Sequence, residues 1–502
     1  MSRNYLDILA GTILNNWDQP ALTDFYLTED GKAQDTSRGN HYTYGEMYEK
    51  IVQVADMLTR LGLQKGDHIA VCGANSAHWA IAYLAIAKMQ GISVIVMHSL
   101  QIDEIARLID FADTKVLFTD KDLWKDLKEQ PIPQVRNVIA LEDWDTLFGE
   151  KQIINHKLHI TNSQCSFVNG EPDDLAMICF TSGTTKDPKG VMSPCRGLNN
   201  NIEATLHFFP KDLNPNYIAF LPFAHMSGLM GELLPQLVIN RHIFICREIY
   251  TLESLYRGIQ ICKPYATIYV PKLYAGFCAK YGDKFLELIK KTCKLLCVGG
   301  SLLDESTETY LEKSGIPIGI VYGLTETTAE ISLSPYRFHR KKSVGKIVNG
   351  MAVCVAPNGE ILVKGENVML GYYKAPEATA KKIDADGWLH TGDRGHLDED
   401  GYLYVEGRLE QDMIVLPNGE NIRPENIEAL INSLPEVAES IVLARDGKLI
   451  AIVVPKAPME RTAVLRAINP QLPLFSQLYD VELTDGPLAR TEKQTLKRYL
   501  YK

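Results

Sequence analysis

The sequence of 502 residues lacks several features that would assign it to a special class of protein. No apolar run reaches the roughly 18 residues that a membrane-spanning helix needs, so no integral membrane segment is expected. The first residues, MSRNYLDILAG, contain no long apolar core of a signal peptide, which favours a cytoplasmic location. The net charge is −10 and the chain has no block of Lys and Arg, which argues against nucleic acid and anionic membranes as main partners.

Paired cysteines are also lacking. The chain has ten cysteines but no CxxC pair, and the nearest two, Cys293 and Cys297, lie in the apolar run CKLLCV. Buried reduced thiols in a cytoplasmic protein are therefore expected rather than a zinc site or a disulfide. The composition, 46% hydrophobic and 23% charged residues, is that of an ordinary globular protein. At this length the chain should divide into two or more domains.

Helical and strand-like segments alternate along the first quarter of the chain. Apolar residues recur at helical spacing through residues 44–61, and short apolar runs read as strands. The expected helices are 44–61, 75–90 and 103–111, and the expected strands are 68–74, 92–97 and 115–119. This alternation predicts right-handed βαβ units around a parallel sheet that is buried on both faces. Residues 120–172 show only weak periodicity and are expected to form only a connecting segment.

The alternation restarts at residue 174 and gives a second α/β layer, with strands expected at 174–180, 217–222, 242–246, 266–270, 294–298 and 316–322. After Ser343, short strands with Gly and Asn-Gly turns predict a small β-barrel-like unit up to Arg408. The last ninety-odd residues predict an α+β unit, with a hairpin at 412–422, a helix at 425–433, strands at 437–444 and 449–455, and a helix at 491–501. We therefore predict an α/β fold with a large N-terminal domain, residues 1–408, and a small mobile C-terminal domain, residues 409–502.

One loop indicates a phosphate-bearing ligand. Residues 180–192, FTSGTTKDPKGVM, combine glycines, hydroxyls and two lysines directly after a strand-like run. Ligands of open α/β sheets bind at the carboxyl ends of strands, and backbone N–H groups, hydroxyls and a lysine suit phosphate. The loop is not a Walker A motif, because Pro188 stands where its second glycine belongs.

The run TSGTTKDPKGV resembles the signature loop of the AMP-forming adenylating enzymes, which include acyl-CoA synthetases, firefly luciferase and peptide-synthetase adenylation domains. Other elements of that family follow in the family's order: GGS at 299–301, YGLTE at 322–326, GEILVKGENVMLGYY at 359–373, HTGD at 390–393 and EGR at 406–408. The resemblance covers roughly residues 40–500. It implies that ATP or AMP, Mg²⁺ and coenzyme A are bound.

The resemblance also implies roles for individual residues. Phosphate contacts fall to Lys189, Thr325 and Glu326, of which Glu326 also contacts magnesium. The remaining nucleotide contacts fall to Thr181, Ser182, Gly183, Thr184 and Thr185 in the signature loop, to Gly299, Gly300, Ser301, Tyr322 and Gly323 around the adenine, and to Asp393 and Arg408 at the ribose. Lys186 stands where the family usually has glycine, and its effect on ATP binding stays open.

The run LPFAHMSGLMG at 221–231 bears on the substrate. Amino-acid-activating members usually carry an aspartate where this chain has Ala224 and His225, and the run looks more like fatty acyl-CoA synthetases, as does 414–428. His225 is either a capping residue or, as the resemblance favours, part of the acyl or pantetheine path. Its apolar neighbours suit a hydrocarbon tail or an ordinary core. A small-molecule carboxylate, most simply a fatty acid, and free CoA are the expected substrates. Chain length, fatty versus aryl acid and oligomeric state stay open.

The C-terminal motif of the family ends in T-x-x-G-K-[IL]-x-R, but this chain has Gln494 at the glycine and Thr495 at the catalytic lysine. Losing such a charged group typically lowers the rate about 10²- to 10³-fold. Lys493 and Lys497 lie two residues to either side, where a helix would turn them away from the position of Thr495. Either lysine could replace the missing one if the segment is shifted or unwound, and which of them does so stays open. The hinge after Arg408 is one residue longer than usual, near Glu410.

Two functions are therefore carried forward. The first is an AMP-forming acyl-CoA ligase, an acid–thiol ligase. The second is a catalytically degenerate relative that binds nucleotide or acyl-adenylate as a sensor or partner, or that performs only the thiol-transfer half-reaction.

Overall fold

The structure is a computed structural model that describes residues 4–28, 35, 38–142, 144, 165–180, 189–208, 215–247, 251–301, 303, 305–409, 414–416, 420–422, 424–486, 488 and 501. The chain divides into two compact units. Unit 1 contains residues 1–180, 190–391 and 395–405, and unit 2 contains residues 181–189, 392–394 and 406–502. The predicted domain boundary between residues 408 and 409 stays a prediction.

The first sheet of unit 1 has seven strands, in the order β18 (Gly371–Tyr372), β8 (Gly190–Pro194), β7 (Leu175–Phe180), β4 (Ile92–Ile95), β3 (His68–Cys72), β5 (Val116–Thr119) and β6 (Asn137–Ala140). The five strands from β7 to β6 are parallel, whereas β8 is antiparallel to β7 and β18 is antiparallel to β8. Ile69 and Val71 belong to the core formed with α2 (Tyr44–Arg60) and α3 (Ala77–Lys88). Ala70 and Cys72 belong to the core formed with α4 (Ile102–Phe111). The predicted parallel sheet, buried on both faces, is confirmed.

Local sequence signals explain where the helices of this layer begin. Thr43 and Glu46 form a capping box at the start of α2, and the Ser76 hydroxyl caps α3. The prediction that residues 120–172 only connect is wrong in part, because α5 (Lys121–Leu127) and β6 lie there. Both elements are too short to show a clear period in the sequence.

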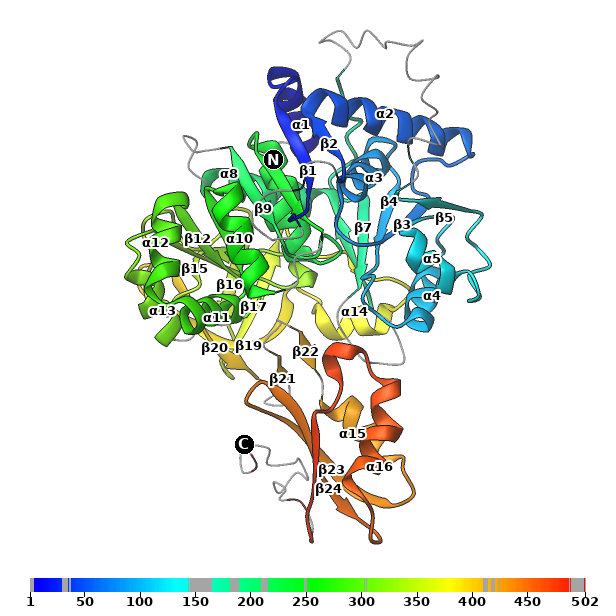
Figure 1. The fold of residues 1–502 in the computed structure, drawn as a ribbon, viewed down its shortest axis with the longest axis vertical. Helices are drawn as coiled ribbons and strands as arrows, with labels where there is room; N and C mark the ends of the chain where they lie inside the picture. Colours follow the sequence, from blue (N-terminus) through cyan, green and yellow to red (C-terminus); the bar gives the residue numbers. More distant parts are fainter. Residues whose placement is uncertain are drawn as a thin grey trace. The chain divides into compact units, whose positions relative to one another are not determined.

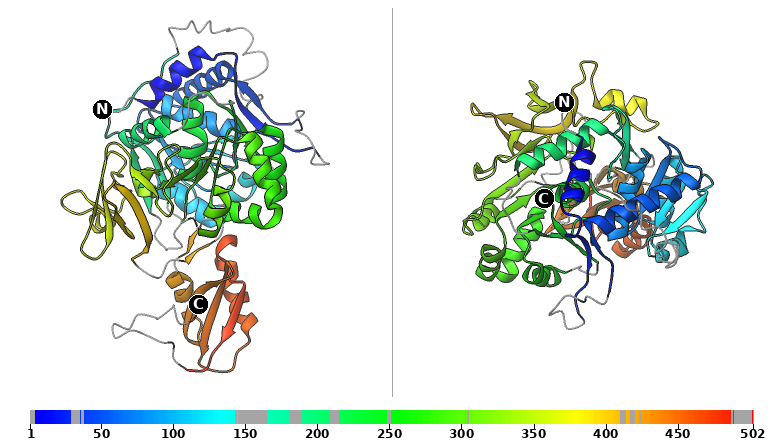
Figure 2. Two further views of the ribbon diagram at one scale, coloured as in Figure 1. Left: turned by 90° about the vertical axis from the view of Figure 1, so that its left-hand side faces the viewer. Right: turned by 90° about the horizontal axis from the view of Figure 1, so that it is seen from above.

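A second sheet has four strands, in the order β2 (His41–Thr43), β1 (Pro20–Phe25), β10 (His242–Cys246) and β9 (Asn216–Ala219). The predicted strand at 242–246 thus pairs with the predicted strand at 217–222 on one side and with the N-terminal strand β1 on the other. Helices α1 (Tyr5–Asn15) and α9 (Leu234–Val238) pack against each other beside this sheet, and α1 lies beside α2 in Figure 2.

The third sheet carries four predicted nucleotide segments. Its nine strands run in the order β11 (Ala266–Tyr269), β12 (Leu295–Val298), β13 (Ile318–Tyr322), β14 (Ser332–Leu333), β15 (Gly345–Ile347), β20 (Tyr402–Arg408), β19 (Leu389–Leu397), β17 (Glu360–Gly365) and β16 (Met351–Val355). The four segments follow β12, end β13, and lie in β19 and β20. The strands β11–β13 are parallel. The short strands predicted after Ser343 are found, and β14 and β15 join them to β13.

Helices cover both faces of β11–β13. On one face Leu296 and Val298 share a core with α10 (Leu252–Cys262), α11 (Pro271–Tyr281), α12 (Asp283–Thr292) and α13 (Glu305–Glu312), which appear together in Figure 1. On the other face α8 (Cys195–Phe208) ends with Phe208 against Gly319, where a Cβ would lie 2.2 Å from the phenyl ring. The small helix α14 (Pro376–Lys382) follows β18.

Unit 2 has the predicted α+β character. Strands β23 (Val437–Arg445), β24 (Lys448–Pro455) and β25 (Asp480–Leu483) form a sheet. One face packs on α15 (Pro424–Asn432) and α16 (Arg461–Ile468). The predicted hairpin is found as β21 (Ile414–Val415) and β22 (Asn421–Ile422), and short 3₁₀ turns span Asn469–Gln471 and Leu474–Ser476. The helix predicted at 491–501 lies outside the described residues.

All ten cysteines are free and six of them are buried. Within the described part of the chain, no helix is both long enough and apolar enough to cross a membrane.

Candidate functional site

The predicted adenine segments leave from neighbouring strands. Val298 of β12 pairs in parallel with Ile320 of β13, so residues 299–301 and 322–323 emerge at the same edge of the sheet. Gly300 has φ +82°, which a side chain would strain. Gly323 has no room for a side chain, because its Cβ would lie 1.8 Å from the Ala329 carbonyl oxygen. The structure therefore brings Gly299, Gly300, Ser301, Tyr322 and Gly323 together, at the carboxyl ends of parallel strands, where ligands bind open sheets.

Glu326 lies in the next turn, the 3₁₀ segment η2 (Thr325–Thr327). The Tyr372 hydroxyl donates to Glu326 Oε1 at 2.7 Å, and the Met369 N–H donates to the Glu326 carbonyl at 2.9 Å. Tyr372 therefore orients the carboxylate that the resemblance assigns to magnesium. In the sequence, the only signal for Tyr372 is its place near the end of the 359–373 match, which does not distinguish it from its neighbours.

The end of β7 lies close to both Glu326 and the His225 loop. Cys179 Sγ lies 3.9 Å from the Ala224 carbonyl oxygen. Burial, with the Glu326 carboxylate nearby, raises the pKa of Cys179 to about 12. The signature loop begins one residue after Phe180, the last residue of β7. Three segments far apart in the sequence thus converge at one edge of unit 1.

His225 is exposed by its accessible surface, yet protein surrounds the ring closely enough for desolvation to lower its pKa. The Ser227 N–H donates to His225 Nδ1 at 3.2 Å, and the Ser227 hydroxyl lies 2.7 Å from the same nitrogen. Because Nδ1 accepts a hydrogen bond, the neutral ring carries its hydrogen on Nε2. This bond to the first turn of the helix fits the alternative that His225 is a capping residue. The bond involves Nδ1 and not Nε2.

The loop that carries His225 is held from two sides. Glu232, fully buried in the π-helical turn η1 (Gly228–Leu233), accepts the Phe220 N–H at 2.8 Å and the Leu221 N–H at 2.6 Å. Asn75 donates to the Leu221 carbonyl and accepts the Phe223 N–H, each at 2.7 Å. Sequence patterns did not single out Glu232 or Asn75, since both act across the fold. Together they fix the backbone that presents His225.

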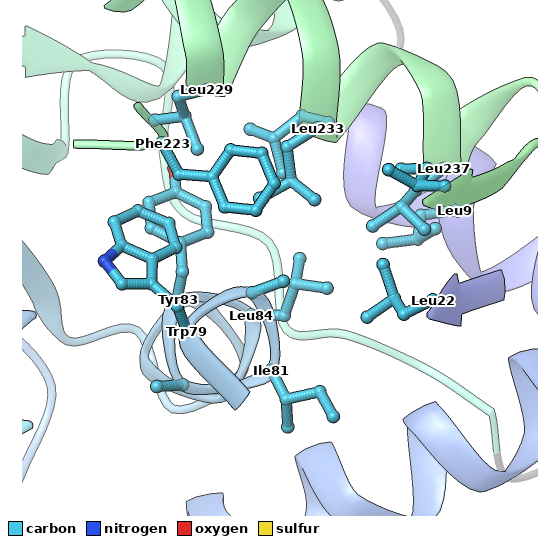
Figure 3. Packing of buried hydrophobic residues seen from close by; sticks show 14 of the residues in the cluster. Leu9, Leu22, Trp79, Ile81, Tyr83, Leu84, Phe223, Leu229, Leu233 and Leu237 are labelled. Carbon is cyan, nitrogen blue, oxygen red and sulfur yellow. The ribbon is translucent and has the colours of Figure 1, made fainter. Parts of the chain in front are cut away.

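The apolar neighbours of His225 belong to the core. Phe223 and Leu229 are fully buried, and Met226 and Met230 are at most 2% exposed. The Phe223 ring lies 5.6 Å from that of Trp79, and Figure 3 shows Phe223, Leu229 and Leu233 directed toward α3. Of the two alternatives for this run, ordinary core packing is the one that the structure favours.

The other predicted residues are placed singly or not at all. In unit 2, Lys189 is half-buried just before β8, and Asp393 in β19 is 4% exposed. Only the backbone of Arg408 is described, at the end of β20. The remaining predictions fall outside the described residues: Thr181, Ser182, Gly183, Thr184, Thr185, Lys186, Glu410, Lys493, Thr495 and Lys497.

The magnesium prediction rests on one carboxylate. Among the described residues no group of three or more His, Cys, Asp or Glu side chains is arranged to hold a metal. Mg²⁺ at a nucleotide site is usually held by one or two carboxylates together with phosphate oxygens. Glu326, oriented by Tyr372 beside the predicted nucleotide segments, fits that mode of binding.

Comparisons with known proteins identify the family of the chain. The family model of AMP-binding enzymes matches residues 15–373. Among curated proteins, a 2-succinylbenzoate–CoA ligase of Bacillus cereus is 27% identical over 430 residues, which are 83% of each chain. The 2-succinylbenzoate–CoA ligase of Oceanobacillus iheyensis is 28% identical over 425 residues, 82% of this chain and 83% of that protein.

Solved structures show the same fold. A double mutant of o-succinylbenzoate CoA synthetase (MenE) from Bacillus subtilis has a TM-score of 0.78 at 23% identity, covering 99% of this chain and 98% of its own. The amide bond synthetase McbA from Marinactinospora thermotolerans has a TM-score of 0.78 at 20% identity, covering 98% of both chains. A fatty acyl CoA synthetase of Mycobacterium tuberculosis has a TM-score of 0.67 at 21% identity, covering 99% and 97%. The resemblance seen in the sequence is confirmed: the chain belongs to the family of AMP-binding enzymes.

Proposed function

We propose that the protein is an AMP-forming acid–CoA ligase. A carboxylate oxygen of the acid attacks the α-phosphorus of ATP, which gives an acyl-adenylate and releases pyrophosphate. The CoA thiol then attacks the acyl carbon, gives up its proton, forms the thioester and releases AMP. The observation that carries the proposal is the convergence of residues 299–301, residues 322–326 and the ends of β7 and β9 in a chain that matches the AMP-binding family.

The roles of the side chains follow from the family resemblance. Tyr322 and residues 299–301 contact the adenine, Asp393 and Arg408 the ribose, and Lys189, Thr325 and residues 181–185 the phosphates. Glu326 would hold magnesium, which would supply positive charge to the phosphates. His225 lies on the path of the acyl group or the pantetheine. The structure supports this arrangement through the bonds that orient Glu326 and the His225 loop.

For the acid, we propose an oxygen-rich aromatic acid of the 2-succinylbenzoate type rather than a fatty acid. The curated relatives described above are named as 2-succinylbenzoate–CoA ligases. The apolar run around His225, which suggested a hydrocarbon tail, is packed into the core. The prediction of a fatty acid therefore lacks support from either source.

A second function is kept because Thr495 stands where the family has its catalytic lysine. A neutral hydroxyl does not offset negative charge as an ammonium group does, and the adenylation step would slow about 10²- to 10³-fold. A protein of this kind would bind nucleotide or acyl-adenylate, or would perform only the transfer to CoA.

The deciding experiment measures ATP-dependent pyrophosphate release with Mg²⁺ and CoA. The acids are 2-succinylbenzoate, other aryl acids, and short, medium and long fatty acids, and Thr495→Lys is assayed beside the native chain. Release with one acid class by the native chain would establish the ligase, and Lys493→Ala and Lys497→Ala would then show which lysine replaces the missing one. Activity confined to Thr495→Lys would show that the first half-reaction is lost. Absence of pyrophosphate release from both chains would refute the ligase and leave the function of a binding protein.

A further inference from the structure

A cavity of about 590 Å³ lies in unit 1, between helix α8 and the strands β14 and β15. The apolar part of its wall includes Phe208 of α8, Leu333 of β14 and Val348, all of which are buried. Cavities of this size, with an apolar wall and a few polar groups, are typical of sites for small molecules. None of the residues that line it is among those that the family resemblance assigns to the nucleotide, the acid or CoA. The cavity is therefore a candidate site for a second ligand.

Helix α8 contributes one polar stripe to the wall of the cavity. Asn200, Glu203 and His207 all line it, and they stand three and four residues apart, which is the spacing of one helix face. At a rise of 1.5 Å per residue, the three side chains extend over roughly 10 Å of the helix. Leu198 and Ile202, on another face of α8, are packed into the core instead. The helix therefore has a core face and a separate polar face at the cavity.

Each side chain of this stripe offers a hydrogen-bond acceptor. Asn200 Nδ2 donates to the Asn349 carbonyl at 2.7 Å and to Asn367 Oδ1 at 2.9 Å, so both amide hydrogens are used and Oδ1 is left to accept. His207 Nδ1 donates to the Glu203 carbonyl at 2.7 Å, so Nε2 of the neutral ring is an acceptor. Glu203 adds a half-buried carboxylate, whose oxygens have no hydrogen bond or ion pair with another described residue. The stripe is therefore suited to a ligand that is rich in donors.

A buried hydroxyl belongs to the part of the wall that follows β14. Ser334 lines the cavity and is 1% exposed, and its hydroxyl has no hydrogen-bond partner within the described part of the chain. The Ser334 N–H donates to the Ile320 carbonyl at 2.9 Å, so the backbone of this residue is fixed by the sheet. A buried hydroxyl without a partner costs about 1–3 kcal/mol. Its place in the wall of the cavity therefore indicates that a polar group of a ligand bonds it.

The charged groups of the wall favour a cation over an anion. A second glutamate, Glu366, adjoins the stripe, since a Cβ on Gly350 would lie 2.8 Å from Asn200 Oδ1 and 3.0 Å from Glu366 Cγ. Lys346 also lines the cavity, but it is exposed and its ammonium lies 4.9 Å from the centre of the Tyr402 ring, which does not belong to the wall. A primary ammonium group brings three N–H donors to the acceptors of α8, whereas an ionised carboxylic acid brings none. The wall thus suits an amine.

The cavity is separate from the predicted adenine segments. Ser334 bonds Ile320, and Phe208 packs on Gly319, so the cavity adjoins the first part of β13. The adenine segment begins at Tyr322, the last residue of that strand. Two residues of a strand extend over about 7 Å, which is enough to separate the two places. A ligand in the cavity therefore does not occupy the place of the nucleotide.

We propose that this cavity is a second binding site, which takes a primary amine with an aromatic or alkyl body. The ammonium group bonds the Glu203 carboxylate and the neighbouring acceptors of α8. The body lies against Phe208 and Leu333, and the Ser334 hydroxyl bonds a polar atom of that body. The site goes beyond the proposed ligase function and does not depend on it, because none of its residues has a role in that reaction.

The test uses calorimetry with the full chain and three indole compounds that differ only in their polar end: tryptamine, tryptophol and indole-3-propanoate. Tryptamine carries the ammonium group and should bind at least about tenfold more tightly than the hydroxyl and carboxylate compounds. Glu203→Gln should raise the Kd of tryptamine roughly tenfold, because a neutral amide replaces the carboxylate. Ala204→Phe fills the cavity from α8 and should abolish binding. Excess AMP should leave the Kd of tryptamine unchanged.

Glu49→Gln is the matched control, because Glu49 is also a half-buried glutamate on a helix, α2, and does not line the cavity. It should bind tryptamine as the native chain does, and a native-like melting temperature shows that each variant is folded. Absence of saturable tryptamine binding, or equal affinity for the three compounds, would overturn the inference and would mean that water satisfies Ser334. Tryptamine binding that both cavity variants leave unchanged, or that AMP displaces, would place the amine elsewhere and overturn the inference too.

Discussion

Replacing Glu232 by leucine should loosen the loop that presents His225. The Glu232 carboxyl oxygen accepts two backbone N–H groups, those of Phe220 and Leu221, and Glu232 is fully buried. Burial raises the pKa of the Glu232 carboxyl group above its ordinary value. Leucine leaves both N–H groups without an acceptor, at about 1–3 kcal/mol each, and recovers part of this by apolar burial. We expect a net loss of about 2–4 kcal/mol in the free energy of unfolding.

Glutamine is the matched control at the same position. Its amide oxygen can accept both N–H groups, and its side chain is nearly equal in size to that of glutamate, so the expected loss is below about 1 kcal/mol. Urea unfolding followed by tryptophan fluorescence measures both variants, because all five tryptophans lie in unit 1. The role assigned to Glu232 would be refuted if the leucine variant were as stable as the native chain, or if the glutamine variant were as unstable as the leucine variant.

Three further predictions concern residues 323–330 and the tyrosine that bonds Glu326. Tyr372→Phe should raise the Mg²⁺ concentration for half-maximal pyrophosphate release about three- to tenfold, because Glu326 loses a hydrogen bond. Tyr373→Phe should leave this concentration unchanged, because the Tyr373 hydroxyl bonds Asp113 instead. Equal shifts in both variants would contradict the role of Tyr372. Gly323→Ala should abolish AMP binding measured by calorimetry, because the added Cβ would meet a backbone oxygen. Gly11→Ala should bind AMP normally, because nothing lies within 4 Å of its added Cβ. Binding by both variants would show that the backbone around Gly323 adapts to a side chain. Glu330→Gln should become more stable relative to the native chain as pH rises from about 4.5 to 8, by at most about 1.4 kcal/mol per pH unit. The reason is that the pKa of Glu330, which burial raises to about 8, stabilises the native chain at low pH, and this stability is lost as the carboxyl group ionises. A pH-independent difference between the two chains in urea unfolding would contradict the raised pKa.

The sequence predicted well those features that depend on neighbouring residues. Apolar runs such as 68–74 and 294–298 form buried parallel strands because their side chains must be covered on both faces. The family resemblance assigned Gly299 and Tyr322 to the adenine, and the structure has both at the carboxyl ends of neighbouring parallel strands. Residues 181–185, Lys493 and Thr495, which carry the phosphate contacts and the missing lysine, stay predictions.

Features that depend on contacts across the fold were not predictable from one sequence. Tyr372 reaches Glu326 over 46 residues, and Glu330 meets Thr205 over 125. No periodicity or spacing in the sequence marks such pairs. The apolar run around His225 shows the opposite difficulty, because a core segment and a lining for a hydrocarbon tail require the same residue types, and only burial against Trp79 separates them.

The pairing of β1 with β10 has a consequence for how the chain folds during its synthesis. Leu22 lies opposite Ile243, so the N-terminal strand waits for about 220 further residues before its partner exists. At synthesis rates of ~5–20 residues per second, this wait lasts roughly 10–45 seconds. The β8 edge of the seven-stranded sheet waits almost as long, since Tyr372 of β18, the partner of Val191, comes about 180 residues later. During translation the growing chain therefore exposes two unpaired strand edges, and the capacity of chaperones to cover such edges should govern the yield of folded protein.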